Sequence, residues 1–268
     1  MSNYFTKNNS CCSRKKSGTI VFFFVGIIGI CQPAFGQIGD AILALGKTGS
    51  SGHHIYFSQR SQQKWSSPMQ LSFSDKPEIL PTLASNAQGE IWIVWTELAQ
   101  GGGKLKFRFR QNGKWNTTVL LKTENTSDMA PSIIVDSEGD TWLVWAGTDH
   151  QDDDIFFSRW GNGEWTLPGK VNADDNWPDI LPQIGLSDIG MPEVTWSGFD
   201  GKNYVTFTSN WTGTAWSPEQ VLMSKTKIRE IDMAAIINEL PDFVTDLNQT
   251  SIHFSRDGKA TTLRLKNK

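Results

Sequence analysis

Acidic residues recur at one position of a fifty-residue period in this 268-residue chain. Each stands three residues before a proline, or before the alanine that replaces it in the last copy, and a second acidic set follows the next apolar run. Carboxylate oxygens gathered in this way can bind Ca²⁺ or accept hydrogen bonds from sugar hydroxyls. An acid ahead of a strand can instead cap a turn, and both interpretations stay open. The first set is Glu78, Asp128, Asp179 and Asp232, and the second is Glu97, Asp149 and Asp200.

A tryptophan and an acidic loop add to these candidates. Trp177 stands among Asp174, Asp175 and Asp179, a pairing suited to stacking on a sugar ring. The loop 149–154 lacks the glycine and the terminal glutamate of an EF-hand, so a solvated polar loop is the alternative to a Ca²⁺ site. No other cofactor is predicted. No Ser-His-Asp grouping or phosphate-binding loop occurs, so no catalytic residue is assigned. The candidate metal ligands are Asp152, Asp153 and Asp154.

Aromatic residues keep the same period and indicate what must position these acids. Four tryptophans are spaced by 50, 50 and 51 residues, and four phenylalanines by 50 each. A fixed period of this length, filled with short strand-like runs, is typical of a β-propeller. We expect the tryptophans to pack under turns on outer strands. The two series are Trp65, Trp115, Trp165 and Trp216, and Phe57, Phe107, Phe157 and Phe207.

The unit 128–172 reads as four strands of one propeller blade: 131–136, 141–145, 155–158 and 164–168. Units 78–122 and 179–223 follow the same pattern. Residues 39–72 supply only the last three strands of a blade, and 229–268 gives a degenerate copy with strands at 231–237, 242–245, 251–255 and 261–265. The prediction is a single all-β propeller of about five four-stranded blades, in which 261–265 either ends the last blade or fills the gap in the first. The alternative is four blades, with 231–237 completing the first and a C-terminal hairpin appended.

The third-to-fourth strand turns resemble the BNR or Asp-box repeats of sialidase-like propellers, whose motif runs seven residues from serine to tryptophan. Ser58, Ser158 and Ser209 keep that span to Trp65, Trp165 and Trp216, whereas Arg108 replaces the serine in the second copy. The aspartate survives only at Asp257. The resemblance implies a structural role for these turns. Sialidase catalysis in that family uses a tyrosine nucleophile and an arginine triad, and the chain after residue 36 has only Tyr56 and Tyr204, on expected third strands.

The first 36 residues are typical of an export signal. A basic segment, 14–16, precedes an apolar run from Thr19 to Cys31, and Ala34-Phe35-Gly36 supplies the small residues of a cleavage site. The propeller domain is then 37–268, with no membrane span after cleavage. All three cysteines lie in the signal, so the mature chain has no disulfide, which fits a secreted or periplasmic bacterial protein. The net charge of −3 argues against a nucleic-acid partner.

These features favour an exported, BNR-like propeller that binds glycan or another surface ligand. The alternative is a divergent glycoside hydrolase that uses loop carboxylates such as Glu97, Asp149 or Asp179. A third interpretation is a structural or protein-interaction domain without a small ligand. The sequence leans away from an enzyme because the expected inner strands carry no acid at their ligand-face ends.

Overall fold

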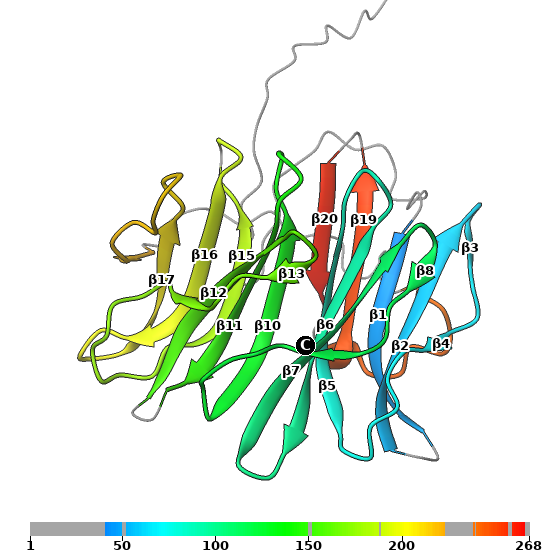
Figure 1. Ribbon diagram of the computed structural model, residues 1–268, viewed down its shortest axis with the longest axis horizontal. Coiled ribbons are helices and arrows are strands. Elements are labelled where there is room, and N and C mark those ends of the chain that lie inside the picture. Colours follow the sequence, from blue (N-terminus) through cyan, green and yellow to red (C-terminus); the bar gives the residue numbers. More distant parts are fainter. Residues whose placement is uncertain are drawn as a thin grey trace, which may run out of the picture.

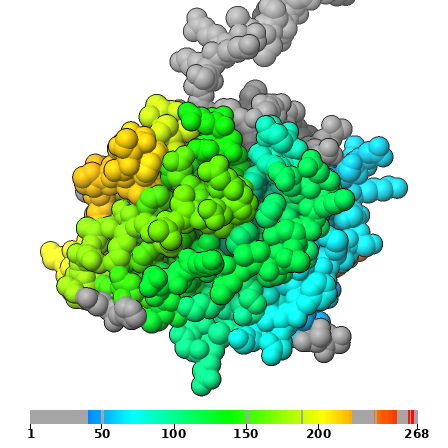
Figure 2. Space-filling view, viewed as in Figure 1, coloured from blue at the N-terminus to red at the C-terminus, as the bar shows by residue number. Residues whose placement is uncertain are grey.

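The computed structural model describes residues 41–49, 52–149, 152–187, 189–222, 238, 240–256 and 259–265. These residues form antiparallel sheets and one three-residue 3-10 helix, Leu247–Gln249. Four sheets lie side by side in chain order (Figure 1), and Figure 2 shows their sequence-coloured bands in close contact on one face. The arrangement confirms the predicted all-β propeller fold. The expected signal peptide, 1–36, lies outside the described residues.

The second, third and fourth blades each follow the predicted four-strand pattern. Their outer strand is short. In the second and third blades it is split into two pieces that both pair with the third strand. In the third blade Pro168 separates the pieces, since a proline has no N–H to donate to the ladder. The second blade is β5 (Glu78–Ser85), β6 (Ile91–Ala99), β7 (Gly102–Gln111), β8 (Lys114–Trp115) and β9 (Val119–Leu120). The third is β10 (Ser127–Val135), β11 (Thr141–Thr148), β12 (Asp153–Gly161), β13 (Glu164–Trp165) and β14 (Gly169–Lys170). The fourth is β15 (Ile180–Leu186), β16 (Pro192–Phe199), β17 (Tyr204–Asn210) and β18 (Gln220–Val221).

The first blade is completed by the C-terminus of the described chain. It contains β1 (Ala41–Gly49), β2 (Gly52–Ser61), β3 (Lys64–Trp65) and β4 (Met69–Gln70), with β19 (Thr250–Arg256) paired to β1 and β20 (Lys259–Arg264) paired to β19. Ile252 faces Leu43 across this pairing, so an apolar edge that would otherwise stay open is covered.

This closure corrects the expected placement of 251–255 as the third strand of a fifth blade. Residues 242–245, expected as a strand, instead form a turn in which Val244 N–H donates to Pro241 O at 3.0 Å. The described residues contain four sheets, and 231–237 lies outside them. The hairpin is tied to inner strands of neighbouring blades: Ser251 donates to Pro81 O at 2.8 Å and Arg264 to Pro131 O at 2.6 Å.

The hydrophobic core lies between adjacent blades, and the aromatic period explains how it is filled. In the first three blades, a phenylalanine on the third strand meets, edge to face, the outer tryptophan of the next blade. The ring centroids are 5.2 Å apart for Phe57 and Trp115, 6.0 Å for Phe107 and Trp165, and 5.5 Å for Phe157 and Trp216.

The serine of each motif-like turn holds that turn closed. Ser58 donates to Ser66 O at 2.8 Å, Ser158 to Thr166 O at 2.8 Å and Ser209 to Ser217 O at 2.7 Å. In the second copy the Arg108 guanidinium donates to Asn116 O at 2.7 Å instead. These turns are therefore structural.

No helix in the described part of the chain has the length and apolar character that crossing a membrane would need. The loops between second and third strands lie along one edge of the molecule, the lower edge in Figure 1. The backbone thus places the second set of acids on a common side.

Candidate functional site

A repeated β-bulge orients the first set of acids. The residue before each inner-strand proline has a positive φ: 53° at Leu80, 52° at Ala130 and 56° at Leu181. At each of these points the pairing between first and second strands shifts register. A bulge bends a strand and redirects its side chains. The acid two residues earlier is buried near the edge of its blade: Glu78 is 1% exposed, Asp128 1% and Asp179 5%.

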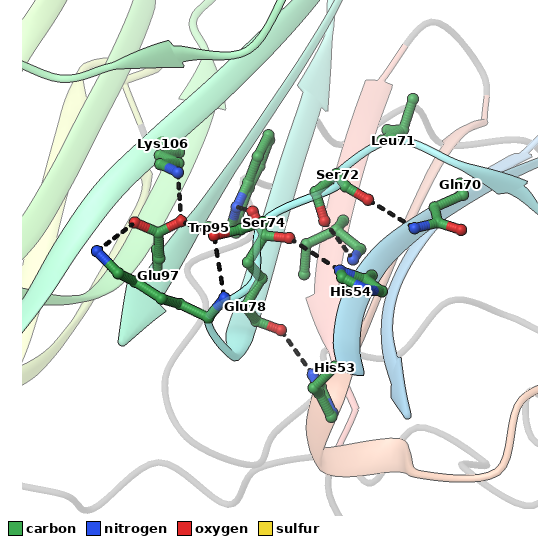
Figure 3. Close-up of polar contacts among 12 residues, drawn as sticks. His53, His54, Gln70, Leu71, Ser72, Ser74, Glu78, Trp95, Glu97 and Lys106 are labelled. Carbon is green, nitrogen blue, oxygen red and sulfur yellow. Dashed lines mark hydrogen bonds and ion pairs between the residues drawn. The ribbon is translucent and has the colours of Figure 1, made fainter. Parts of the chain in front are cut away.

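Glu78 lies at the junction between the first and second blades, which we call the first junction (Figure 3). Its Oε1 accepts from Trp95 Nε1 at 2.9 Å, and its Oε2 lies 3.3 Å from Nδ1 of the buried His54. His53 Nδ1 lies 2.6 Å from the Glu78 backbone oxygen. The two histidines, which point to opposite faces of a strand, thus contact one residue through different atoms. Both oxygens of the Glu78 carboxylate therefore have a partner, the Trp95 indole N–H and the His54 imidazole.

Glu97 lies opposite Glu78 across the strand pair. Its carboxylate binds Lys106 Nζ and the Ser74 hydroxyl, and Lys76 Nζ is 4.0 Å away (Figure 3). Burial raises the pKa of Glu97, but the bonds to Lys106 and Ser74 outweigh it, so the pKa lies below its ordinary value. At the first junction Glu97 therefore has lysine partners, and Glu78 has a histidine and an indole N–H as partners.

Asp128 occupies the same position at the second junction. Its Oδ1 accepts from Asn125 Nδ2 at 2.8 Å and from Trp145 Nε1 at 2.7 Å, and its Oδ2 accepts from the Thr123 hydroxyl at 2.6 Å. Lys104, which corresponds to His54 in the repeat, donates to Asn125 O at 2.7 Å. The tryptophan partner common to Glu78 and Asp128 shows that these acids fasten the first strand of a blade to its second.

Asp179 lies at the third junction, between the third and fourth blades, and its surroundings are acidic. Asn172 Nδ2 donates to Asp179 Oδ2 at 2.7 Å and to Asp154 Oδ1 at 2.8 Å, so one amide bridges two carboxyl groups. Burial, followed by the charges of Glu219 and Asp175, raises the pKa of Asp179 to about 7. Trp196 lies near this carboxyl and opposes the shift, but no regular hydrogen bond joins its Nε1 to a described group.

Lys170 occupies the centre of a three-carboxylate group beside this junction. Its Nζ is 2.7 Å from Asp149 Oδ2, 2.6 Å from Asp154 Oδ2 and 2.5 Å from Asp174 Oδ1. Ligand atoms of these three acids lie within 4.8 Å of one another, the spacing a metal ion needs. The lysine ammonium thus stands where a cation would bind, and the three bonds hold the pKa of Lys170 above its ordinary value although burial lowers it.

The other candidate metal ligands divide between two environments. Asp153 Oδ1 accepts from the Thr148 hydroxyl at 2.5 Å. Asp152 Oδ2 is buried without a hydrogen-bond partner in the described chain. Burial, then the charges of Asp154 and Asp149, raises the pKa of Asp152. The sequence-adjacent acids 152–154 therefore do not form one ligand set, and Asp154 joins Asp149 and Asp174 instead.

Three aromatic side chains form an exposed cluster next to these acids, and we call it the aromatic platform: Trp177, Phe199 and Tyr204. The centroids of Trp177 and Phe199 are 4.7 Å apart, and those of Phe199 and Tyr204 5.6 Å. Trp177 is 48% exposed and Tyr204 61% exposed. Sequence reasoning selected Trp177 but missed its two partners. Phe199 and Tyr204 could have been found from the sequence because they lie on either side of the predicted turn between the second and third strands, β16 and β17.

Two acids shape the loops that carry the platform. Asp175 Oδ1 accepts from Trp177 N–H at 2.8 Å, and Asp200 Oδ1 accepts from the N–H groups of Lys202 and Asn203 at 2.9 and 2.8 Å. These backbone bonds lower the pKa of Asp200. The structure thus gives both acids a turn-capping role through Oδ1. Their Oδ2 atoms accept no hydrogen bond among those described.

No protein-family model matches the chain, and no curated protein sequence matches it. Among solved structures, a protein of unknown function from Dyadobacter fermentans superposes with a TM-score of 0.53 at 11% identity, over 85% of this chain and 80% of that one. An endo-arabinase from Bacteroides thetaiotaomicron gives 0.47 at 13% identity, over 85% and 90%. A fucose lectin from Kordia zhangzhouensis gives 0.35 at 19% identity, over 51% and 95%. At these identities the likeness concerns the fold alone.

Proposed function

We propose that this protein is an exported glycan-binding module whose ligand site is the aromatic platform at the third junction. The observation that carries this proposal is the contact of three rings, Trp177 half exposed and Tyr204 largely exposed, in loops that also carry carboxylates. The platform brings together one loop from the outer strand of the third blade and one from β16 and β17, the two kinds of loop that form the ligand face of a propeller.

The chemistry of the platform suits a sugar. An exposed aromatic ring offers an apolar face to the C–H groups of a pyranose, and leaving such a ring in water costs free energy that a ligand recovers. The Oδ2 atoms of Asp175 and Asp200 can accept hydrogen bonds from sugar hydroxyls while their Oδ1 atoms keep the loops in shape. Ca²⁺ is not required by this arrangement because the Lys170 ammonium already lies between the three nearby carboxylates.

One observation favours glycoside hydrolysis as a second candidate activity. Asp179 has a pKa of about 7, so a large part of it carries a proton at neutral pH, as a general acid must. Asp179 is 5% exposed, so a substrate oxygen reaches its carboxyl only if the surrounding residues move. Release of reducing sugar from a polysaccharide panel, abolished by Asp179→Asn, would establish this activity in place of simple binding.

The proposal is tested on a glycan array with matched variants. The fluorescently labelled protein is expected to bind a defined set of glycans, and Trp177→Ala is expected to lose that binding with an unchanged melting temperature. The control is Phe73→Ala, because Phe73 is an aromatic residue 74% exposed in the corresponding loop of the first junction. Failure of the parent protein to bind any glycan, or equal loss in both variants, would refute the site.

A further inference from the structure

The acids around the aromatic platform outnumber their positive partners. Lys170 is shared by Asp149, Asp154 and Asp174, and Lys202 lies beside Asp200. Four further acids form no ion pair within the described chain, and one of them, Asp179, is partly protonated at neutral pH: Asp152, Asp175, Asp179 and Glu219. A site with this balance repels an anionic ligand and attracts a cationic one.

Asp175 is the common element of this negative field. Its charge raises the pKa of Asp152, Asp179 and Glu219, in each case after the larger effect of burial. Its Oδ1 also accepts from Trp177 N–H, so the acid that couples the cluster is hydrogen-bonded to the backbone of a platform residue. The apolar surface and the negative field thus belong to one loop.

Two oxygen atoms of the cluster have no partner. Asp152 Oδ2 and Glu219 Oε2 are shielded from solvent, and neither accepts a hydrogen bond from a described group. A shielded carboxylate oxygen without a donor costs free energy. A ligand that brings a positive charge to this junction lowers that cost and also relieves the repulsion between the acids.

Resting on the proposed function, we infer that the ligand is an amine-bearing saccharide, a glycan of the glucosamine type with free ammonium groups. The sugar ring stacks on Trp177, and an ammonium group is held between the aromatic faces and the carboxylates. Aromatic faces attract cations, and the attraction grows when the cation also leaves water beside negative charges. Uronic and other acidic sugars are excluded by the same field.

Isothermal titration calorimetry with two oligosaccharides of equal length tests this inference. The probes are penta-glucosamine and penta-N-acetylglucosamine at pH 6.5, which differ in whether each nitrogen is a protonatable amine or a neutral acetamide. We expect the amine form to bind at least tenfold more tightly in 20 mM NaCl, and the ratio to shrink in 200 mM NaCl because salt screens the field. Asp175→Asn keeps the acceptor for Trp177 N–H and should lower the ratio. Asp75→Asn, in the corresponding exposed loop of the first junction, should not.

The outcomes separate this inference from the proposal beneath it. Equal affinity for the two probes, or binding of neither while array glycans still bind through Trp177, overturns the amine preference and leaves the glycan site standing. Amine binding that survives Trp177→Ala shows general attraction to charge and also overturns it. Loss of amine binding in 1 mM CaCl₂, with a rise in melting temperature, assigns the field to a metal instead. Absence of any glycan binding refutes both.

Discussion

The first and third junctions are built from the same repeat positions, but the acids are paired with basic residues at the first and outnumber them at the third. His54 and Asp154 are 100 residues apart and equivalent in the period, and each faces the inner-strand acid of the next blade. At the first junction the pair is a base with an acid. At the third it is two acids joined by the amide of Asn172. An aspartate in place of the histidine at this repeat position thus makes the junction acidic without changing the fold.

The second junction shows the intermediate case. Lys104 takes the equivalent position and contacts the backbone of Asn125, which in turn donates to Asp128. Asp128 keeps its tryptophan partner, as Glu78 does, whereas Asp179 has no regular bond from Trp196. Trp196 therefore stabilises the ionised form of Asp179 only weakly, and burial has the larger effect on the pKa of Asp179.

The largest effect is expected from breaking the first junction. Glu78→Ala removes the acceptor of Trp95 Nε1, whose indole is fully buried, and the carboxylate beside His54. Loss of one partner of a buried pair costs about 3–5 kcal/mol, so the free energy of unfolding in urea should fall by that order. Glu138→Ala, at an exposed turn, is the control. A loss below about 1 kcal/mol would show that Glu78 does not fasten this junction.

The next effect concerns pH at the third junction. The pKa of Asp179 rises from 3.8 to about 7 on folding, so between these values the folded state binds more protons than the unfolded state. The free energy of unfolding therefore decreases as pH rises from about 4 to about 7. Asp179→Asn removes this dependence. Between pH 4 and pH 8, the free energy of unfolding of the variant should therefore gain on the order of 3 kcal/mol relative to that of the parent. If the free energy of unfolding changed with pH by the same amount in both proteins, the raised pKa of Asp179 would be contradicted.

A smaller effect is expected from Lys170. Lys170→Gln leaves Asp149, Asp154 and Asp174 without their shared cation, and Asp154 is 1% exposed. Stability should fall by about 2 kcal/mol, and Ca²⁺ should restore part of it because the three ligand atoms lie within 4.8 Å. The parent protein and Lys202→Gln should show no Ca²⁺-dependent rise in melting temperature. A Ca²⁺ response of equal size in the parent would show that the lysine does not replace the ion.

The smallest effect on stability is expected from the aromatic platform. Trp177→Ala should change the free energy of unfolding by less than about 0.5 kcal/mol, because the ring is half exposed and lies outside the core. Trp145→Ala, a fully buried equivalent of Trp95, should lose about 3–5 kcal/mol. A comparable loss in both variants, measured by urea unfolding, would mean that Trp177 is a packing residue.

The fold was largely predictable because the residues that repeat every fifty positions are the ones that pack between adjacent blades. The Phe57 and Trp115 series repeats since each pair fills the same gap between blades. The placement of 251–255 was not predictable. An apolar pattern indicates that a strand is buried, but it does not indicate which sheet the strand pairs with. Only the pairing of Ile252 with Leu43 reveals that the C-terminal strand closes the first blade.

The candidate site was predictable in part. The repeat correctly indicated that Glu78, Asp128 and Asp179 hold equivalent places, but it could not show that each serves its own junction rather than a common centre. Lys170 was missed because it lies on the outer strand of the blade, far in sequence from the loop 149–154 that supplies two of its three acids. Phe199 and Tyr204 were missed because aromatic contact across a loop depends on tertiary geometry.

One spectrum tests the central claim that the third junction binds ligand and the first does not. The ¹⁵N-labelled indole Nε1–H signals of Trp177 and Trp95 report on the two junctions in the same sample. On titration with the saccharide that binds most strongly on the array, the Trp177 signal should shift and saturate while the Trp95 signal stays in place. A saturable shift of Trp95 with an unmoved Trp177 would contradict the account.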